Sequence, residues 1–307
     1  MEKKPFRIGT RCSPLALAHA FETRSSLMDV HKIPPHNIVI IPLSTKGDRI
    51  TNRTLTEIGG KGLFTEEIEK KLISGEIDCA VHSAKDMPTK LLKGLQISAY
   101  LPREDIRDVF ISHTAQSLKD LALHSVIGTS SLRRKALLLR WRSDISVIDF
   151  RGKIETRLNK LNNNKAHAIL LAYAGIKRLK KEKVIKEILN IEDFPPSPGQ
   201  GAICIETHVN NPKAQELVKV INHEDTWDSV NCERAFLAEL DGSCKSAIAG
   251  FAYCKGSTLY FYGIVLASDG KIFHEVSRNG NRCDAINIGR DAAQYIRFIS
   301  NKNVFNF

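Results

Sequence analysis

Short apolar runs, separated by polar turns and by stretches with helical spacing of apolar residues, make up most of residues 7–206. Each run has the length of a buried strand, and a helical stretch follows most of them. Such alternation of strand and helix signals is typical of α/β domains, in which helices cover a largely parallel sheet. The expected strands are residues 7–10, 38–43, 77–81, 95–101, 109–112, 125–128, 145–149, 167–172 and 203–206.

The pattern changes after residue 206. Two helical stretches, around residues 211–221 and 224–240, precede three segments in which apolar and polar residues alternate, and a last helix runs through Phe298. Alternation with a period of two predicts strands that are covered on one face only. The expected strands are residues 247–253, 259–267 and 271–277. We therefore expect a small α+β domain in this part of the chain.

Two connectors divide the chain into domains. A charged segment that begins with proline, residues 102–108, is typical of a crossing between domains. A segment rich in proline and glycine, residues 194–202, leads to the strand at 203–206, which we expect to return to the first domain. With 307 residues the chain is too long for one ordinary core. We predict three domains: residues 1–103 with 200–222, residues 104–199, and residues 223–307.

A lysine and an aspartate lie side by side just beyond the strand at residues 77–81. In open α/β sheets, ligands bind beyond the carboxyl ends of strands, which makes Lys85 and Asp86 candidates for the chemistry of the chain. Taken alone, the dipeptide is more typical of an exposed ion pair before a proline turn. The arginines at other turns favour the functional interpretation.

Arginines recur where strands lead into helices. The first of these turns has Ser13 as a helix N-cap and Pro14 at the first helical position, so free N–H groups there favour an anion. A cation at a helix amino terminus opposes the helix dipole unless an anion answers it, and guanidinium groups bind carboxylates with two parallel hydrogen bonds. We infer a cleft between two parallel-sheet domains that binds a polyanion. The arginines are Arg11, Arg133, Arg134, Arg151 and Arg178.

Composition and charge limit the classes of protein to which the chain can belong. No apolar run approaches the roughly 20 residues that cross a bilayer, and residues 1–6 lack the apolar segment of a signal peptide, so we expect a cytoplasmic protein without a membrane partner. A net charge of +11 fits either nucleic-acid binding or a ligand with many carboxylates. The arginines lie at strand ends rather than beside stacking aromatic residues, so we expect no nucleic-acid partner.

Cysteines and glycines add two further expectations. The seven cysteines lack C-x-x-C spacing, which argues against a disulfide framework and a zinc site, and we expect no metal. Residues 48–58 form a long polar connection that is typical of a mobile lid. Glycines at 59, 60 and 62 could cradle a phosphate, but no Ser or Thr follows Lys61, so this is not a Walker loop.

Several of these turns belong to longer motifs that occur in one order in the porphobilinogen deaminase family, also called hydroxymethylbilane synthases. The chain resembles that family over essentially its whole length. The motifs are Arg7-Ile-Gly-Thr-Arg-Cys-Ser-Pro-Leu-Ala-Leu17, Gly59-Gly-Lys-Gly-Leu-Phe64, Val81-His-Ser-Ala-Lys-Asp-Met-Pro88, Gly128-Thr-Ser-Ser-Leu-Arg-Arg134, Arg151-Gly with Thr156-Arg-Leu158, and Gly199-Gln-Gly-Ala202.

The resemblance implies an α/β fold of two domains like those of periplasmic binding proteins, with a hinged cleft, and a small α+β C-terminal domain. It implies a dipyrromethane cofactor bound covalently to Cys244, because Asp241-Gly-Ser-Cys244 matches the motif of the cofactor-bearing cysteine. The neighbouring Lys245 favours the nucleophilic thiolate. The implied activity is that of a monomeric transferase of tetrapyrrole (haem) biosynthesis. It condenses four porphobilinogen molecules stepwise onto the cofactor, with loss of ammonia, and releases hydroxymethylbilane by hydrolysis.

The resemblance also implies roles for single residues. Asp86 is the implied catalytic residue, because loss of ammonia leaves a positively charged azafulvene that a carboxylate near the pyrrole nitrogens stabilises. Each porphobilinogen carries an acetate and a propionate, which arginines would bind. The implied cofactor-binding residues are Cys244, Lys85, Asp86, Thr129, Ser131, Arg133 and Arg134. The implied substrate-binding residues are Arg11, Ser13, Lys61, Phe64, Arg151, Arg157, Arg178 and Gln200.

Three places depart from the pattern that we expect of the family. His19 stands where relatives often carry glutamine, Glu57 where some carry lysine, and residues 245–247 differ after the cysteine. These departures concern contacts of the expected lid and of the turn after Cys244. The alternative function is that of a noncatalytic two-domain protein that binds polycarboxylates. Cys244 and the third domain argue against this alternative.

Overall fold

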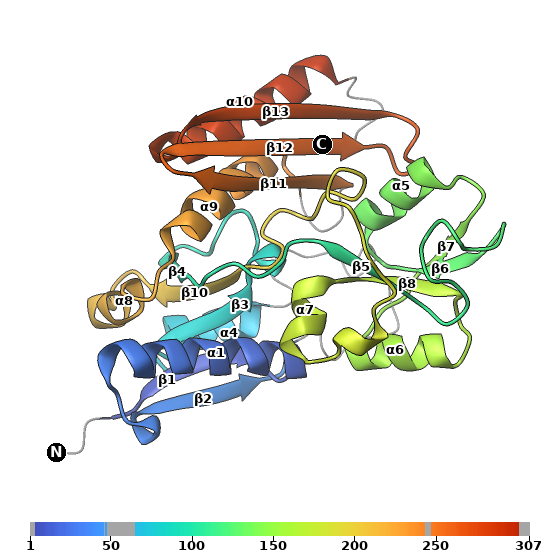
Figure 1. The fold of residues 1–307 in the computed structure, drawn as a ribbon. Coiled ribbons are helices and arrows are strands. Elements are labelled where there is room, and N and C mark those ends of the chain that lie inside the picture. The colour runs from blue at the N-terminus through green and yellow to red at the C-terminus, as the bar shows by residue number, and fades with distance from the viewer. Residues whose placement is uncertain (1–3, 46, 48–64, 243–246, 301–307) are drawn as a thin grey trace. The chain divides into compact units, whose positions relative to one another are not determined.

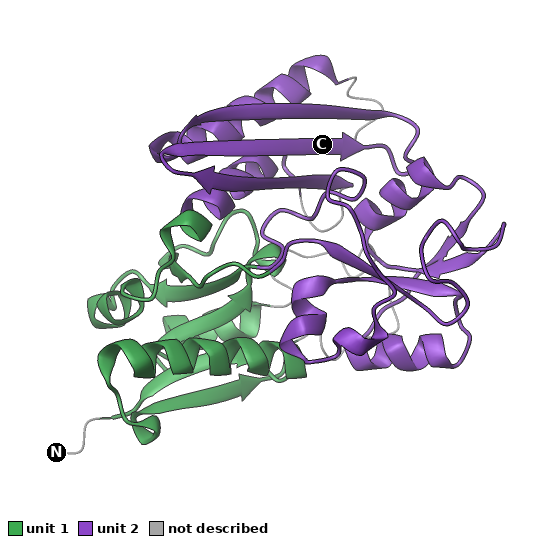
Figure 2. Cartoon of the chain, viewed as in Figure 1, with its two compact units in different colours: residues 1–53, 57–104, 202–227 green, residues 54–56, 105–201, 228–307 purple. Residues whose placement is uncertain are grey.

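The computed structural model describes residues 4–45, 47, 65–242 and 247–300. Contacts within the chain divide it into two compact units, which Figure 2 distinguishes by colour. Of the described residues, unit 1 holds those up to 47 together with 65–104 and 202–227, and unit 2 holds 105–201 and 228–300. Each unit therefore combines segments from separate parts of the sequence.

Unit 1 is built on one sheet with helices on both faces (Figure 1). Its strands are β1 (Phe6–Arg11), β2 (Ile38–Leu43), β3 (Cys79–Ser83), β4 (Leu95–Tyr100) and β10 (Ile203–His208), and its helices include α1 (Pro14–His31), η1 (Pro35–Asn37), α4 (Glu66–Ile73), η2 (Ala84–Asp86) and α8 (Pro212–Lys219). Within the described residues the strand order is β2-β1-β3-β10-β4. β1 is parallel to β2 and β3, whereas β10 is antiparallel to β3 and β4.

The two faces of this sheet have different partners. α1 and α8 pack on the face that carries Val81 and Ile205, and α4 packs on the face that carries Ala80. Because both faces are covered, β3 and β10 consist mainly of buried apolar residues. Buried ionisable side chains in these strands, such as His82 and Glu206, are therefore exceptional. Side chains alternate along a strand, so His82 lies on the same face as Ala80, which is the face covered by α4. Glu206 pairs with Ala80 and lies on that face too.

Unit 2 contains a second sheet with the same plan (Figure 1). Its strands are β5 (Asp108–Ser112), β6 (Val126–Gly128), β7 (Ser146–Ile148), β8 (Ala168–Ala172) and β9 (Glu187–Ile188), and its helices are α5 (Leu132–Trp141), α6 (Ile154–Asn162), α7 (Tyr173–Arg178) and η3 (Glu182–Val184). Among the described residues, the strand order of this sheet is β7-β6-β8-β5-β9. β6 is parallel to β7 and β8, and β5 is antiparallel to β8 and β9.

The two sheets correspond strand by strand, with β5 in the place of β10. The chain leaves unit 1 after β4 and enters unit 2 as β5, and it later returns as β10. The expected return of residues 203–206 to the first sheet is confirmed. Each sheet is mixed rather than wholly parallel, because these two strands arrive directly from a connector, without the helix that a parallel connection needs.

A third sheet lies in the C-terminal part of unit 2. Its strands are β11 (Ile248–Lys255), β12 (Thr258–Leu266) and β13 (Phe273–Asn281), and its helices are α9 (Glu224–Glu239), which begins in unit 1, η4 (Arg282–Asp284) and α10 (Ala285–Ile299). The strands are antiparallel in sequence order, and one face packs against α9 and α10. The fold class, two like α/β sheets and a small α+β part, is therefore confirmed.

The third sheet and the second share a core. Ala249, Ile264 and Leu266 pack with apolar residues of α5 and β8 in one buried cluster. This contact places both sheets in unit 2, and the division into three domains stays a prediction. The hinged cleft also stays a prediction. Among the described residues, no helix has the length and hydropathy required to cross a bilayer.

Candidate functional site

A small cavity of about 60 Å³ lies in unit 1 where β1 and β3 end. Arg11, Ser13 and Asp86, three residues that the sequence predicted to act on one ligand, line it together with His19 and His82. Because water occupies about 30 Å³ per molecule in the liquid, the cavity accommodates one small polar group, such as a carboxylate or an ammonium group. It is a subsite rather than a pocket for a whole pyrrole.

The topology explains why these residues meet. Ile8 pairs with Cys79 and Gly9 with Ala80 in parallel register, so β1 and β3 end at the same edge of the sheet. At that edge, β1 delivers Arg11, and β3 runs into η2, which carries Asp86. The strand pattern of the sequence therefore brings the two residues together.

The amino end of α1 completes this edge. The Ser13 hydroxyl caps the helix and accepts a hydrogen bond from the Ala16 N–H at 3.3 Å, with Pro14 at the first helical position, as predicted. Thr10 Oγ1 lies 3.1 Å from the Val81 carbonyl and 3.2 Å from that of Ala16, which ties β1, β3 and α1 together. The free N–H groups of the helix add a positive potential beside the cavity.

The turn that carries Lys85 and Asp86 is held by its backbone. The Ala84 N–H donates to the Ala202 carbonyl at 3.0 Å, and the Met87 N–H donates to Ala84 at 3.2 Å. Asp86 is therefore fixed by a strand pairing that involves the connector before β10. This restraint suits a carboxylate that acts at one defined point.

Three buried ionisable residues, His82 of the cavity lining together with Glu206 and Glu69, lie on the α4 side of the sheet. His82 Nε2 is 3.4 Å from Glu206 Oε2, and Glu69 of α4 is 2% exposed. Burial raises the pKa of Glu69, and the charge of Glu206 raises it further. Sequence reasoning missed this group. The available signal was a glutamate within the apolar strand 203–206 and a histidine one position beyond the strand at 77–81.

In unit 2, Arg133 and Arg134 converge on a buried aspartate. Arg133 Nη2 donates to Asp108 Oδ2 at 2.7 Å, and Arg134 Nη2 donates to Oδ1 at 2.8 Å. Gln200 Nε2 also donates to Asp108 Oδ1, at 2.9 Å, and to the Ile106 carbonyl at 2.7 Å. The anion that answers these two arginines is thus an internal carboxylate, which sequence reasoning assigned to a connector.

The donors of the two arginines are used unequally. Arg134 donates from all three guanidinium nitrogens, including a bond from Nη1 to the Leu170 carbonyl at 3.1 Å. Arg133 donates through both Nη atoms, to Asp108 and to the Pro195 carbonyl, whereas its buried Nε has no hydrogen bond in the described part of the chain. Arg133 therefore keeps one donor for another acceptor.

Of the other predicted residues of unit 2, Thr129, Ser131 and Arg151 lie at strand-to-helix turns, whereas Arg157 lies within α6 and Arg178 is the last residue of α7. The expectation that Arg178 lies at such a turn is therefore wrong, because α7 separates it from the end of β8. Ser131 caps α5 and accepts from the Arg134 N–H at 3.3 Å, and Thr129 Oγ1 accepts from the Ser131 N–H at 3.2 Å. Arg157 Nε donates to the Gly152 carbonyl at 2.8 Å, and Arg178 Nη1 donates to Gly201 at 3.1 Å. These two side chains and that of Arg151 are partly exposed. Three predicted site residues, Lys61, Phe64 and Cys244, and the expected lid at 48–58 lie outside the described residues.

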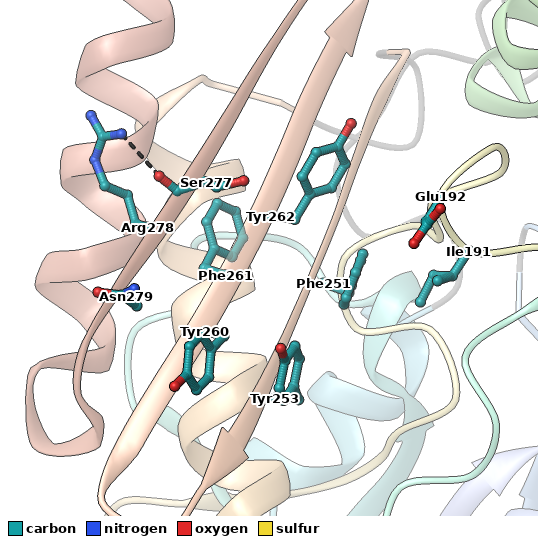
Figure 3. A pocket seen from close by; sticks show the side chains of 10 residues that line it. All are labelled: Ile191, Glu192, Phe251, Tyr253, Tyr260, Phe261, Tyr262, Ser277, Arg278 and Asn279. Atoms are coloured by element: carbon teal, nitrogen blue, oxygen red, sulfur yellow. Dashed lines mark hydrogen bonds between the residues drawn. The ribbon is translucent and has the colours of Figure 1, made fainter.

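A larger open cavity of about 580 Å³ lies on the third sheet, as Figure 3 shows. Two cross-strand ring pairs line it: Tyr253 with Tyr260, whose ring centroids are 5.1 Å apart, and Phe251 with Tyr262, at 5.9 Å. None of the predicted site residues is among those that line it. We therefore place the candidate site at the smaller cavity, where a carboxylate, an arginine and a helix amino terminus coincide.

Comparison with solved structures finds similarities at low sequence identity. The VFT2 domain of BvgS from Bordetella pertussis has a TM-score of 0.42 at 14% identity, and the similarity covers 70% of this chain and 84% of that one. A putative methionine-binding lipoprotein from Bacillus subtilis has a TM-score of 0.43 at 13% identity, with 71% and 91% covered.

Sequence comparison is more specific. The family model for the dipyromethane cofactor binding domain of porphobilinogen deaminase matches residues 6–216, and that for the C-terminal domain of the same enzyme matches residues 227–297. Porphobilinogen deaminase from Nitrobacter winogradskyi is 47% identical over 290 residues, which cover 94% of this chain and 92% of that protein. These matches do not favour the noncatalytic alternative. The chain belongs to the porphobilinogen deaminase family.

Proposed function

We propose that Asp86 is the catalytic carboxylate of this porphobilinogen deaminase, and that Arg11 and Ser13 bind a carboxylate of the substrate beside it. The family condenses four porphobilinogen molecules with loss of ammonia and releases hydroxymethylbilane. One observation carries the proposal: the parallel pairing of β1 with β3 brings these three residues to a single cavity at the amino end of α1.

The chemistry of ammonia loss suits such a site. When the C–N bond of the aminomethyl group breaks, its electron pair leaves with ammonia, and the pyrrole becomes a cation. A fixed carboxylate stabilises that charge as it develops, an interaction that is stronger in the transition state than in the ground state. Arg11 and the α1 amino end carry the opposite charge, so they hold the substrate carboxylates without competing for the cation.

The residues present also fit the family's dipyrromethane cofactor. Ser131 at the amino end of α5 and the unpaired, buried Nε of Arg133 are donors suited to carboxylates. When bound, the cofactor supplies the pyrrole carbon to which the first substrate is joined. We propose that it is attached to Cys244 and held by Lys85, Asp86, Thr129, Ser131, Arg133 and Arg134. Lys61, Phe64, Arg151, Arg157, Arg178 and Gln200 complete the proposed substrate site.

We further propose that the enzyme acts in the cytoplasm as a monomer, without a membrane or nucleic-acid partner. The placement of Arg11, Arg133 and Arg151 at strand ends or strand-to-helix turns, rather than beside stacking aromatic residues, supports the absence of a nucleic-acid partner. The net charge of +11 is then explained by a substrate and a growing product that both carry carboxylates.

Turnover of Asp86→Asn tests the catalytic role. The substitution keeps the shape of the side chain and removes its charge, so turnover should fall on the order of 100-fold or more while cofactor content and substrate binding are retained. Asp86→Glu keeps the charge about one methylene away and should retain partial activity. Steady-state and single-turnover rates, with cofactor content checked by intact mass, provide the measurement.

Asp78→Asn is the matched control, because Asp78 precedes β3 and pairs with Arg7 at 2.9 Å instead of lining the cavity. This variant should keep full turnover. If Asp86→Asn were as fast as the parent, or were impaired only in substrate affinity, the role given to Asp86 would be wrong, and Lys85 would be the next residue to vary.

A further inference from the structure

His82, Glu206 and Glu69 form a buried ionisable group, called here the acid–histidine cluster. They come from β3, β10 and α4, and all three are at least nine-tenths buried. In the antiparallel pairing, Cys204 faces His82 and Glu206 faces Ala80, which makes His82 and Glu206 diagonal neighbours on one face of the sheet. The 3.4 Å separation of Nε2 and Oε2 follows from that register.

The hydrogen bonds of this cluster are incomplete. Among the described residues, His82 Nε2, both oxygens of Glu206 and Oε1 of Glu69 are buried without a hydrogen-bond partner. Buried polar groups without partners are costly and rare in folded proteins, so the sequence keeps this group at the expense of stability. Such an arrangement is more typical of a functional site than of a structural one.

The cluster can hold protons. Two carboxyl groups buried side by side do not readily ionise together, and burial followed by the charge of Glu206 raises the pKa of Glu69. His82 bears a positive charge when protonated, and this charge favours the ionised form of the neighbouring carboxylates. The charges of Glu206 and His82 therefore both act on Glu69, in opposite directions.

His82 connects this cluster to the candidate site. Its side chain lines the same small cavity as Asp86, Arg11 and Ser13. The ionisable groups that approach it from the elements packed around β3 are Arg11 from β1, His19 from α1, Glu69 from α4, Glu206 from β10 and Asp86 from η2. The cluster thus reaches the cavity of the proposed catalytic carboxylate through His82.

We propose that the acid–histidine cluster is a proton relay, in which His82 is the catalytic residue that exchanges a proton with the cavity, and Glu206 and Glu69 are positioning residues. The proposal rests on the function proposed for Asp86. When the new C–C bond forms, the α-carbon of the terminal pyrrole must lose its proton, and the C–H electron pair returns to the ring. In each cycle, protonated His82 first gives a proton to the departing ammonia, which leaves as ammonium. His82 then accepts the proton of the α-carbon and carries it to the ammonia of the next cycle.

The division of labour follows from charge. Asp86 stabilises the cation before the bond forms, and His82 takes the proton afterwards. Glu206 offsets the charge of the imidazolium, because it lies beside Nε2 and is fully buried. The raised pKa of Glu69 disfavours a second negative charge in the cluster. One general base of this kind typically contributes 100-fold or more to a rate.

Kinetics of His82→Gln and Glu206→Gln against pH test the relay. In His82→Gln, kcat should fall about 100-fold with KM nearly unchanged. In Glu206→Gln, the acid limb of the kcat profile should move, because the substitution removes the charge that lies beside Nε2 of His82. A variant in which only folding is impaired would have a smaller active fraction at every pH, and the acid limb of its kcat profile would not move.

Glu233→Gln is the matched control. Glu233 is fully buried in unit 2 and accepts hydrogen bonds from the backbone N–H groups of Gly199 and Ala252 at 2.6 and 2.7 Å. Its substitution should leave the limb in place.

The outcomes separate the relay from the proposed function. Full turnover and an unmoved acid limb in His82→Gln, with Asp86→Asn inactive, would overturn the relay and leave the role of Asp86 intact. Full turnover in both variants would overturn both. A limb that moves equally in Glu206→Gln and Glu233→Gln would also count against the relay, because it would report a general effect of removing a buried charge.

Discussion

Asp108 explains how a helix of this chain can begin with two arginines. It is fully buried, and Arg133, Arg134 and Gln200 all donate to its carboxylate. Burial by itself raises the pKa of Asp108, but the two guanidinium groups outweigh burial and hold the pKa well below its usual range. The sequence indicated that an anion must answer these arginines. It could not identify Asp108, which lies 25 residues before Arg133 and resembled part of a charged connector.

Asp108→Asn should therefore destabilise the protein strongly. Removing one partner of a buried ion pair leaves uncompensated charge and typically costs about 3–5 kcal/mol in the free energy of unfolding. Asp105→Asn is the control, because Asp105 pairs with Arg107 at 2.6 Å in a partly exposed site, where a loss of at most about 1 kcal/mol is expected. Urea unfolding at neutral pH measures both. Equal losses in the two variants would contradict the importance given to burial.

The same residue fixes a direction for the dependence of stability on pH. Because its folded-state pKa is depressed, Asp108 contributes stability that is present above its unfolded pKa of about 3.9 and is lost as the pH falls toward the folded value. The parent should thus lose stability between about pH 5 and pH 3 more steeply than Asp108→Asn does. Parallel curves for the two proteins would show that another group governs acid unfolding.

Glu69 makes stability depend on pH in the opposite direction. Burial, reinforced by Glu206, raises its folded-state pKa, so its contribution is fully present below the unfolded pKa and is lost as the pH rises through the folded value. Glu69→Gln should gain stability relative to the parent as the pH rises, because the amide never has to ionise. Glu66→Gln on the same helix, where Glu66 pairs with Lys70 at the surface, should show no such gain. Chemical unfolding at several pH values decides between these outcomes.

At the scale of elements, the hydrophobic pattern predicted where strands occur better than how they pair. The runs at 77–81 and 203–206 correspond to β3 and β10. Their antiparallel pairing could not be foreseen, because a strand's direction depends on the connection that delivers it rather than on its own residues. β9, with two residues, is too short to leave a pattern. It is formed by pairing with β5.

The candidate site was predictable to a similar degree. Arg11, Ser13 and Asp86 could be placed together because each follows or caps an element whose end was visible in the sequence. The acid–histidine cluster could not, since the sequence shows Glu206 as the end of an apolar run and gives no sign of the histidine that faces it. Contacts between distant segments decide which polar residues in a strand are isolated and which form a group.

Gly270 tests how closely the third sheet packs on α5. It has a φ of +73°, and a Cβ there would lie 2.2 Å from the Ala136 carbonyl oxygen and 2.7 Å from the Arg140 N–H nitrogen. Gly256 has a φ of +60° but open space around the same position, so it is a matched control. Both Gly→Ala variants should lose about 1 kcal/mol for the backbone strain. Gly270→Ala should lose about 1–3 kcal/mol more for the clash. Equal thermal shifts would contradict the close approach.

At the scale of the whole molecule, two sheets of one plan each end in turns that carry arginine. Arg11 ends β1 in unit 1, and Arg151 follows β7 in unit 2. Because parallel strands end at one edge, each sheet places an arginine at the edge where ligands of open α/β sheets bind. The plan is repeated, but the chemistry is not: among the described residues, only unit 1 has the adjacent Lys85 and Asp86 at such an edge.

The mass of the whole chain tests the covalent attachment of the cofactor. If the cofactor is attached to Cys244, the purified protein should be heavier than its sequence by one dipyrromethane, and peptide mapping should place the adduct on that residue. Cys244→Ser should lack both the adduct and turnover. Of the other cysteines, Cys79 and Cys232 are buried, and burial raises the pKa of both thiols, so neither should be able to substitute as nucleophile.

Labelling of the native enzyme with a thiol reagent supplies the control for access. Cys12 and Cys283 are exposed and should be modified quickly, whereas the buried Cys79, Cys204 and Cys232 should react only after unfolding. Cys12 and Cys283 are exposed and could also react. An adduct found on Cys244 alone would therefore show that the surroundings of Cys244, rather than exposure to solvent, determine which cysteine is modified. An adduct on Cys12 or Cys283, or active enzyme with an unmodified Cys244, would refute the attachment.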